Sequence, residues 1–193
     1  MGRDSVETKL NARRLRRAMS DLRPRTPPKK LAEILAIPDP FYFLDALVNL
    51  AVPPGTNFHP PPEKRHELRQ MIVTLRGIYI YAGGDGIWKF LIEERAAPRF
   101  AKAQAWVQDI GASRARAYLD ATATAFPEGQ IPTDDDTRED MLLGSAEVAA
   151  RLRKLDQDYK DCFDEIAECL REYIRQHFEL FRKELEDEEN RVV

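Results

Sequence analysis

Residues 79–90 read Tyr-Ile-Tyr-Ala-Gly-Gly-Asp-Gly-Ile-Trp-Lys-Phe, and this stretch decides the fold. An apolar helical pattern over residues 63–82 stops at Gly83-Gly84, because glycine adopts the left-handed conformation at a helix C-terminus without a Cβ penalty. Asp85 is placed to cap the helix that follows. The sequence therefore predicts two core helices whose relative direction is set by this break.

Before the break, Leu68, Met71, Ile72 and Leu75 repeat at the i, i+3, i+4, i+7 spacing of a helix that faces a core. Similar patterns, punctuated by proline or glycine, predict further helices on both sides of the break. These helices are expected over residues 29–37, from Asp39-Pro40 to Leu50, from Pro98 to Ile110 and from Ser113 to Phe126. Ser113 is expected to cap the last of these. The final helix is predicted to be the longest, with an apolar stripe from Leu152 to Phe181.

These patterns predict an all-α fold, a single multi-helix bundle of seven to nine helices with a long C-terminal helix. A chain of 193 residues is long enough for one domain with a sizeable core. Residues 31–193 are assigned to this all-helical domain. Residues 1–30 are assigned to a basic helical N-terminal extension, which prolines at positions 24, 27 and 28 separate from the rest.

Charge is distributed unevenly along the chain, although the net charge is only −3. Residues 1–30 hold ten Lys/Arg and three Asp/Glu, a net charge of +7. Residues 31–127 hold ten of each, and residues 128–193 hold ten basic and twenty acidic residues, a net charge of −10. Such polarity indicates a nucleic acid or a charged protein partner. The alternative is that head and tail screen each other, within one chain or between subunits.

The sequence also bears on the compartment. No apolar run approaches the roughly 18 residues of a membrane span, so no membrane segment is predicted. The start, Met1 to Ser5, lacks the apolar segment of a secretory signal. Cys162 and Cys169 are seven positions apart on a predicted helix, about 10 Å of rise, which is too far for a disulfide. We therefore expect a cytoplasmic protein with two reduced cysteines.

Five short motifs in a fixed order resemble those of the bacterial DNA-mimic protein family, whose domain has no general assigned function. They are Tyr79 to Trp88, Gly111-Ala112, Phe126-Pro127, Leu155-Asp156 to Tyr159, and Tyr173-Ile174-Arg175-Gln176-His177. The resemblance covers about residues 63–181. It implies an all-helical, DNA-mimic-like domain, a homodimer, and an acidic surface that occupies a DNA-binding protein. Ala82 and Asp85-Gly86 differ from the family pattern on either side of the double glycine.

A row of carboxylates on the last predicted helix is the candidate partner-binding surface. It comprises Asp158, Asp161, Glu165, Glu168 and Glu172. Steps of three and four place these side chains on one flank of a helix, about 5–6 Å apart. Duplex DNA carries one phosphate per strand for about every 3.4 Å of axis, so an acidic row is a candidate decoy for a basic groove. The alternative is an ordinary solvated helix flank.

The N-terminal extension is the alternative site. Arg13, Arg14, Arg16 and Arg17 are suited to phosphate contacts, which would make the protein a nucleic-acid binder. Interleaved aromatic residues and recognisable DNA-binding motifs are missing there, so sequence-specific readout is not predicted.

Catalytic and metal-binding patterns are weak. Asp134-Asp135-Asp136 suits a helix N-terminus better than a metal site, because acidic side chains favour the positive end of the helix dipole. His177 lies on the apolar stripe and is expected to be a core histidine. Trp88 and Trp106 are expected to be core residues. No His-Glu-x-x-His motif, nucleophile elbow or phosphate-binding glycine loop is present. We therefore expect a non-catalytic interaction protein without a cofactor or a metal.

Overall fold

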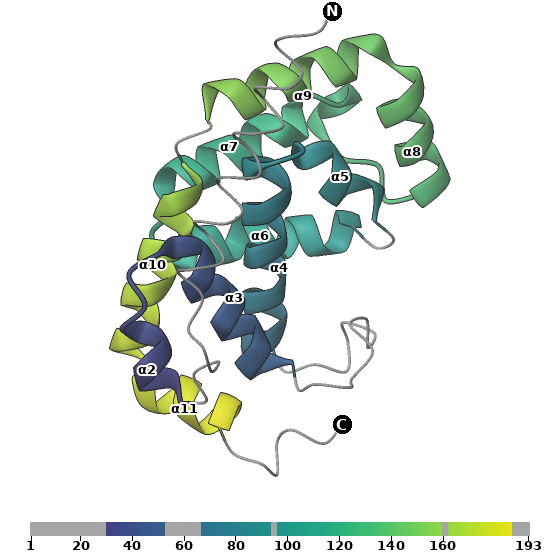
Figure 1. Cartoon of the computed structure of the whole chain (residues 1–193). Coiled ribbons are helices and arrows are strands. Elements are labelled where there is room, and N and C mark those ends of the chain that lie inside the picture. Colours follow the sequence, from purple (N-terminus) through teal and green to yellow (C-terminus); the bar gives the residue numbers. More distant parts are fainter. Residues whose placement is uncertain (1–29, 53–66, 94–95, 160–161, 187–193) are drawn as a thin grey trace, which may run out of the picture.

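The computed structural model describes residues 30–52, 67–93, 96–159 and 162–186. In these ranges the chain forms ten α-helices and no strand, which confirms the all-α prediction (Figure 1). The number of helices exceeds the predicted seven to nine, because the expected C-terminal helix is divided.

The helices are numbered in chain order. Their bounds are α2 Leu31–Leu35, α3 Pro40–Ala51, α4 Glu67–Gly83, α5 Ile87–Ile92, α6 Ala96–Asp109, α7 Ser113–Thr124, α8 Asp135–Gly144, α9 Ala146–Asp158, α10 Phe163–Gln176 and α11 Phe178–Glu186, with a 3-10 turn, η2, at Pro127–Gly129.

Helix α4 is the central element, and it contacts α3, α5, α6, α10 and α11. Its predicted apolar stripe is confirmed, since Ile72, Leu75 and Ile78 are fully buried. Figure 1 shows α8 and α9 at one end of the bundle and α2 and α11 at the other. One hydrophobic cluster nevertheless joins the two ends, since it includes Leu142 on α8 and Leu152 on α9 as well as Leu31 on α2 and Leu185 on α11.

The predicted helix start at Asp39-Pro40 is confirmed. The Asp39 side chain accepts a hydrogen bond from the backbone N–H of Tyr42 at 2.9 Å, and Pro40 occupies the first helical position. Gly111 ends α6 as predicted, with φ +79°, and Ala112 N–H donates to the Val107 carbonyl in a Schellman-type closure.

The prediction of one long C-terminal helix is wrong. The chain forms α9, α10 and α11 instead, with breaks after Asp158 and after Gln176. The segment between the first two helices contains neither glycine nor proline, so local chemistry gives no signal of this break.

Packing around Tyr118 accounts for the first break. The Tyr118 ring on α7 lies 5.7 Å from the Tyr159 ring and 5.3 Å from the Phe163 ring, between centroids. Helix α9 packs against α5, α7 and α8, whereas α10 packs against α3, α4 and α7. The chain changes direction around this buried tyrosine because α9 covers α5 and α8, whereas α10 covers α3 and α4. Both helices contact α7, which carries Tyr118.

The second break corrects the interpretation of His177. This residue is exposed and forms the C-cap of α10, and its ring lies 4.5 Å from that of Tyr173. Beyond it, Phe181 and Leu185 are fully buried. The burial of these two apolar side chains stabilises the chain direction that follows the turn at His177.

Candidate partner-binding surface

The Gly83–Gly86 turn has a different construction from the predicted one. Helix α4 ends at Gly83 as expected, but the residue with positive φ is Gly86, at φ 101° and ψ 151°. Asp85 does not cap α5. Its carboxylate accepts from the Lys89 ammonium at 2.5 Å, and its carbonyl accepts from the Trp88 indole N–H at 2.9 Å.

The carboxylate that caps α5 comes from α9. Oδ1 of Asp156 accepts from the backbone N–H of Ile87 at 3.3 Å and from the Tyr118 hydroxyl at 2.5 Å. A Cβ on Gly86 would lie 2.7 Å from the other Asp156 oxygen. The Gly83–Gly86 turn and the Leu155-Asp156 motif therefore contact each other and form one junction between α5 and α9. Gly86 has no side chain, which leaves the space that the Asp156 carboxylate occupies.

Burial raises the pKa of Asp156, and the hydrogen bonds from Tyr118 and Ile87 oppose that shift. Burial also raises the pKa of Tyr118 well above its ordinary value, with help from Asp156. Tyr118 therefore remains a donor at neutral pH, and the pair serves as a structural link between α5, α7 and α9.

Glu165, a member of the predicted acidic row, caps another helix. Its Oε2 accepts from the backbone N–H groups of Arg114 and Ala115, both at 3.0 Å, at the start of α7. Ser113, the predicted cap, is the first residue of this helix and does not cap it through its side chain. A half-buried Glu165 thus fills the role that a local side chain was expected to fill.

The rest of the predicted row does not form one line, because the helix break divides it. Asp158 is at the end of α9, paired with Lys154 at 2.6 Å, and Asp161 lies outside the described residues. On α10, Glu168 and Glu172 are both exposed, and Glu172 is 3.5 Å from Arg175.

Asp164 joins these two residues at the i, i+4, i+8 spacing. We call Asp164, Glu168 and Glu172 the α10 face; all three side chains are exposed.

A second group of exposed carboxylates lies on α8, and the sequence reasoning missed it. Asp136, Glu139 and Asp140 follow the i, i+3, i+4 spacing of one helix face, and we call them the α8 face. Among the described residues, no basic side chain forms an ion pair with any of them. Arg138, the one basic residue of this helix, faces inward.

Arg138 is only 1% exposed and is held by backbone carbonyls. It donates to Leu91 O at 2.6 Å, to Pro132 O at 3.1 Å and to Glu93 O at 3.3 Å, and it pairs with Asp135. A cation at the C-terminal end of α5 is favoured by the helix dipole. Burial of Arg138 leaves the α8 face without a neutralising charge; a spacing pattern alone does not show which way such a side chain points.

The acidic run at Asp134 begins α8, as predicted. The Asp134 side chain accepts from the backbone N–H of Thr137 at 2.8 Å, which together with the Thr137 hydroxyl lowers its pKa. Throughout the described ranges, no group of three or more His, Cys, Asp or Glu side chains is arranged to hold a metal ion.

Other sequence predictions have separate outcomes. Trp106 is buried in the core as expected, and Trp88 is half-buried against it. Cys162 and Cys169 are not joined by a disulfide. The basic residues Arg13, Arg14, Arg16 and Arg17 lie outside the described residues. Among the helices that the structure describes, none combines the length and the apolar character that a membrane crossing requires.

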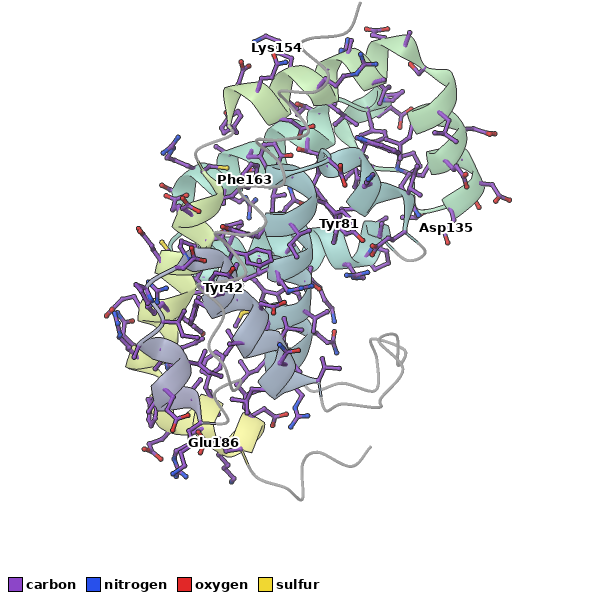
Figure 2. The ribbon with its side chains drawn as sticks, in the orientation of Figure 1. Tyr42, Tyr81, Asp135, Lys154, Phe163 and Glu186 are labelled. Carbon is purple, nitrogen blue, oxygen red and sulfur yellow. The ribbon has the colours of Figure 1, made fainter. Side chains whose placement is uncertain are left out.

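Helices α8 and α10, which carry the two acidic faces, lie apart in the bundle (Figure 1). Asp135, beside the α8 face, and Phe163, at the start of α10, lie on opposite sides of the bundle in the view of Figure 2. Both faces belong to helices whose inner sides are fixed by buried residues, Arg138 and Leu142 on α8 and Ile166 and Leu170 on α10. The two acidic faces therefore belong to separate parts of the bundle.

The described part of the chain is thus an all-helical bundle with exposed acidic helices. The chain belongs to the DMP19-like protein family, whose model matches residues 67–177, and the resemblance to the DNA-mimic family is thereby confirmed. No curated protein and no solved structure matches the chain. The matched region runs from the start of α4 to the end of α10 and contains both acidic faces and the Asp156 junction.

Proposed function

We propose that this protein is a non-catalytic interaction module that presents an acidic helical surface to a basic, DNA-binding protein. Membership of the DMP19-like family supports a role in DNA mimicry. The observation that carries the proposal is the α8 face, three exposed carboxylates with no cation beside them in the described part of the chain. The α10 face adds a second candidate surface with the same chemistry.

Electrostatic arguments favour a basic partner. Carboxylates about 5–6 Å apart on a rigid helix attract a surface that is built to bind phosphates, and they accelerate its approach. Ion pairs exposed to water contribute little individually, so several charges must act together. Binding through such a surface weakens with added salt, as DNA binding itself does.

A pull-down from an extract of the native cells tests the proposal. The α8 variant combines Asp136→Asn, Glu139→Gln and Asp140→Asn, and the α10 variant combines Glu168→Gln and Glu172→Gln. We expect wild-type protein to capture a DNA-binding protein that duplex DNA displaces, and at least one variant to lose that capture. Unchanged capture by both variants would remove the acidic-surface argument.

The α10 variant keeps Glu165, because that residue caps α7 and its replacement would mix folding with binding. Arg151→Gln on the exposed side of α9 is a control substitution that removes a positive charge. It is expected to leave capture intact or to strengthen it.

Nucleic-acid binding through residues 1–30 is the second candidate function, and their net charge of +7 favours it. A salt-titrated binding assay with duplex DNA, using the full chain and a chain without residues 1–30, separates the two functions. Tight DNA binding that disappears with the deletion would support the second candidate. Absence of DNA binding by the full chain would exclude it.

We further propose that the protein acts as a homodimer, as the family resemblance implies. Light scattering after size-exclusion chromatography measures this directly. A mass of about twice 22.2 kDa supports the dimer, and a mass of one chain at all working concentrations contradicts it.

A further inference from the structure

A shallow groove lies where α3, α4 and α10 meet, next to the α10 face. Its volume is about 330 Å³. Its walls are aromatic and its rim holds one carboxylate: Phe41, Tyr79, Ile80, Gly83, Gly84, Phe163 and Asp164 line it. The groove therefore adjoins the Gly83-Gly84 break at the end of α4.

The polar groups of the groove have a defined arrangement. The Tyr79 hydroxyl donates to Oδ1 of Asp164 at 3.2 Å, which orients the carboxylate at the start of α10. Burial raises the pKa of Tyr79, and the charges of Asp164 and Asp39 raise it further. Tyr79 is therefore a donor at neutral pH, and it lies close enough to two carboxylates to be affected by their charges.

Negative charge at the groove is not neutralised from within the described part of the chain. No basic side chain there forms an ion pair with Asp164 or Asp39, although Asp39 accepts the backbone N–H of Tyr42. The groove thus combines aromatic walls with one carboxylate, Asp164, that forms no ion pair among the described residues, and a guanidinium group complements both features.

Arginine suits this site better than lysine. Its planar guanidinium stacks on aromatic rings and pairs with a carboxylate through two parallel hydrogen bonds, whereas the lysine ammonium is a compact, strongly hydrated charge. The same chemistry occurs nearby within the fold, where the Arg171 guanidinium lies 4.5 Å from the centre of the Phe43 ring.

We propose that this groove receives an arginine side chain of a basic protein partner, between the rings of Phe41, Tyr79 and Phe163 and against the carboxylate of Asp164. The inference rests on the proposed function, because it specifies how the basic partner is held at the α10 face. The acidic face supplies attraction at a distance, and the groove supplies a preference for arginine.

Binding of two synthetic peptides tests the inference. They are nine-residue fluorescent peptides with alternating arginine and glycine or alternating lysine and glycine, and their dissociation constants are measured by anisotropy at low ionic strength. We expect wild-type protein to bind the arginine peptide at least fivefold more tightly than the lysine peptide. Asp164→Asn should weaken binding of the arginine peptide about tenfold and abolish the preference.

Glu168→Gln is the matched control. It removes one exposed carboxylate from the same face, one helical turn away and outside the groove lining. It should weaken both peptides equally and by less than threefold. Tyr79→Phe removes only the hydroxyl that orients Asp164 and should reduce the arginine preference while keeping the ring. Thermal melting of each variant establishes that it is folded.

Equal losses in Asp164→Asn and Glu168→Gln, or equal affinity of the wild-type protein for the two peptides, would overturn the inference. Either result would leave the proposed function intact, because capture of a DNA-displaceable partner in the pull-down does not depend on arginine selectivity. A third result would also overturn the inference and retain the proposed function. In the pull-down, the α8 variant alone would lose capture, and Asp164→Asn would capture the partner as well as wild type does.

Discussion

At the junction of α5 and α9, the backbone conformation and the surrounding atoms restrict position 86 to glycine. Gly86 has φ 101° and ψ 151°, a region that is essentially restricted to glycine. A Cβ there would also lie 2.7 Å from Asp156 Oδ2 and 2.9 Å from the Trp88 ring. Strain and collision act together, so this position tolerates no side chain without movement of its neighbours.

Gly86→Ala is therefore expected to reduce the free energy of unfolding by roughly 2–4 kcal/mol, the backbone strain being about 1–3 kcal/mol of that. Gly144→Ala is the control, because a Cβ there meets nothing within 4 Å and its φ is not positive. At this last residue of α8 alanine should be neutral or stabilise by up to about 1 kcal/mol. Urea denaturation of both variants measures the difference; equal effects would contradict this account.

Asp156 offers a second test at this scale. Asp156→Ala leaves the Tyr118 hydroxyl and the Ile87 N–H without their acceptor, and each loss costs about 1–3 kcal/mol. Asp156→Asn retains an acceptor oxygen and should remain within about 1 kcal/mol of wild type. Chemical denaturation distinguishes the variants, and an equally small effect of both substitutions would show that the junction contributes little.

The pH dependence of the same pair follows from the raised pKa of Asp156, which burial causes. The native state holds this proton at a pH where the unfolded chain, with an ordinary pKa of about 3.9, has lost it. Stability from this group is therefore present below about pH 4 and declines as pH rises through the raised pKa. Relative to Asp156→Asn, wild type should lose stability over that interval; a difference that grows in the opposite direction refutes the assignment.

Among the secondary-structure elements, α7 depends on a carboxylate from α10 for its first turn. Replacing Glu165 with alanine should cost about 1 kcal/mol, the ordinary value of a helix cap, while Glu165→Gln keeps an acceptor and should cost less. Hydrogen exchange of the Arg114 and Ala115 amides should accelerate in the alanine variant. Glu168→Ala, three positions along the same helix and exposed, should change neither quantity.

The elements also show what the sequence predicts and what it does not. Helices α3, α4 and α6 were predicted because apolar spacing and flanking proline or glycine act locally. The caps of α5 and α7 were assigned to Asp85 and Ser113. The Ile87 amide is instead capped by Asp156, 69 positions further along the chain. The Arg114 and Ala115 amides are capped by Glu165, 51 and 50 positions further along. Such distant caps, like the breaks around Tyr118 and at His177, result from tertiary packing and leave no local pattern.

The candidate site, too, could be predicted from the sequence only in part, because tertiary contacts decide the role of each carboxylate. The acidic residues of the C-terminal region were recognised, but spacing does not reveal that Glu165 is a cap or that Asp158 is paired with Lys154. The α8 face was missed because Asp136 was interpreted only as part of a helix N-terminus, and no local pattern shows that the neighbouring Arg138 faces inward. The folded structure is needed to show that the Arg138 side chain is only 1% exposed.

For the molecule as a whole, the two cysteines report on the stability of the core. Cys162 is fully buried, whereas Cys169 is half-buried and burial raises the pKa of its thiol. A thiol reagent should label Cys169 first, faster at higher pH, and should reach Cys162 only through opening of the core. Labelling of a Cys169→Ala variant should accelerate with urea; rapid labelling without denaturant would contradict the buried position of Cys162.

The inward position of Arg138 affects how the electrical character of the whole protein is assessed. An isoelectric point adds every ionised group with equal weight, whether it is in contact with water or enclosed by carbonyl dipoles. An approaching protein responds instead to the field at the solvent boundary, where the enclosed guanidinium of α8 is already balanced by Asp135 and three peptide oxygens. A nearly neutral polypeptide can therefore display a strongly anionic local patch, and bulk charge is a poor criterion for recognising proteins of this kind.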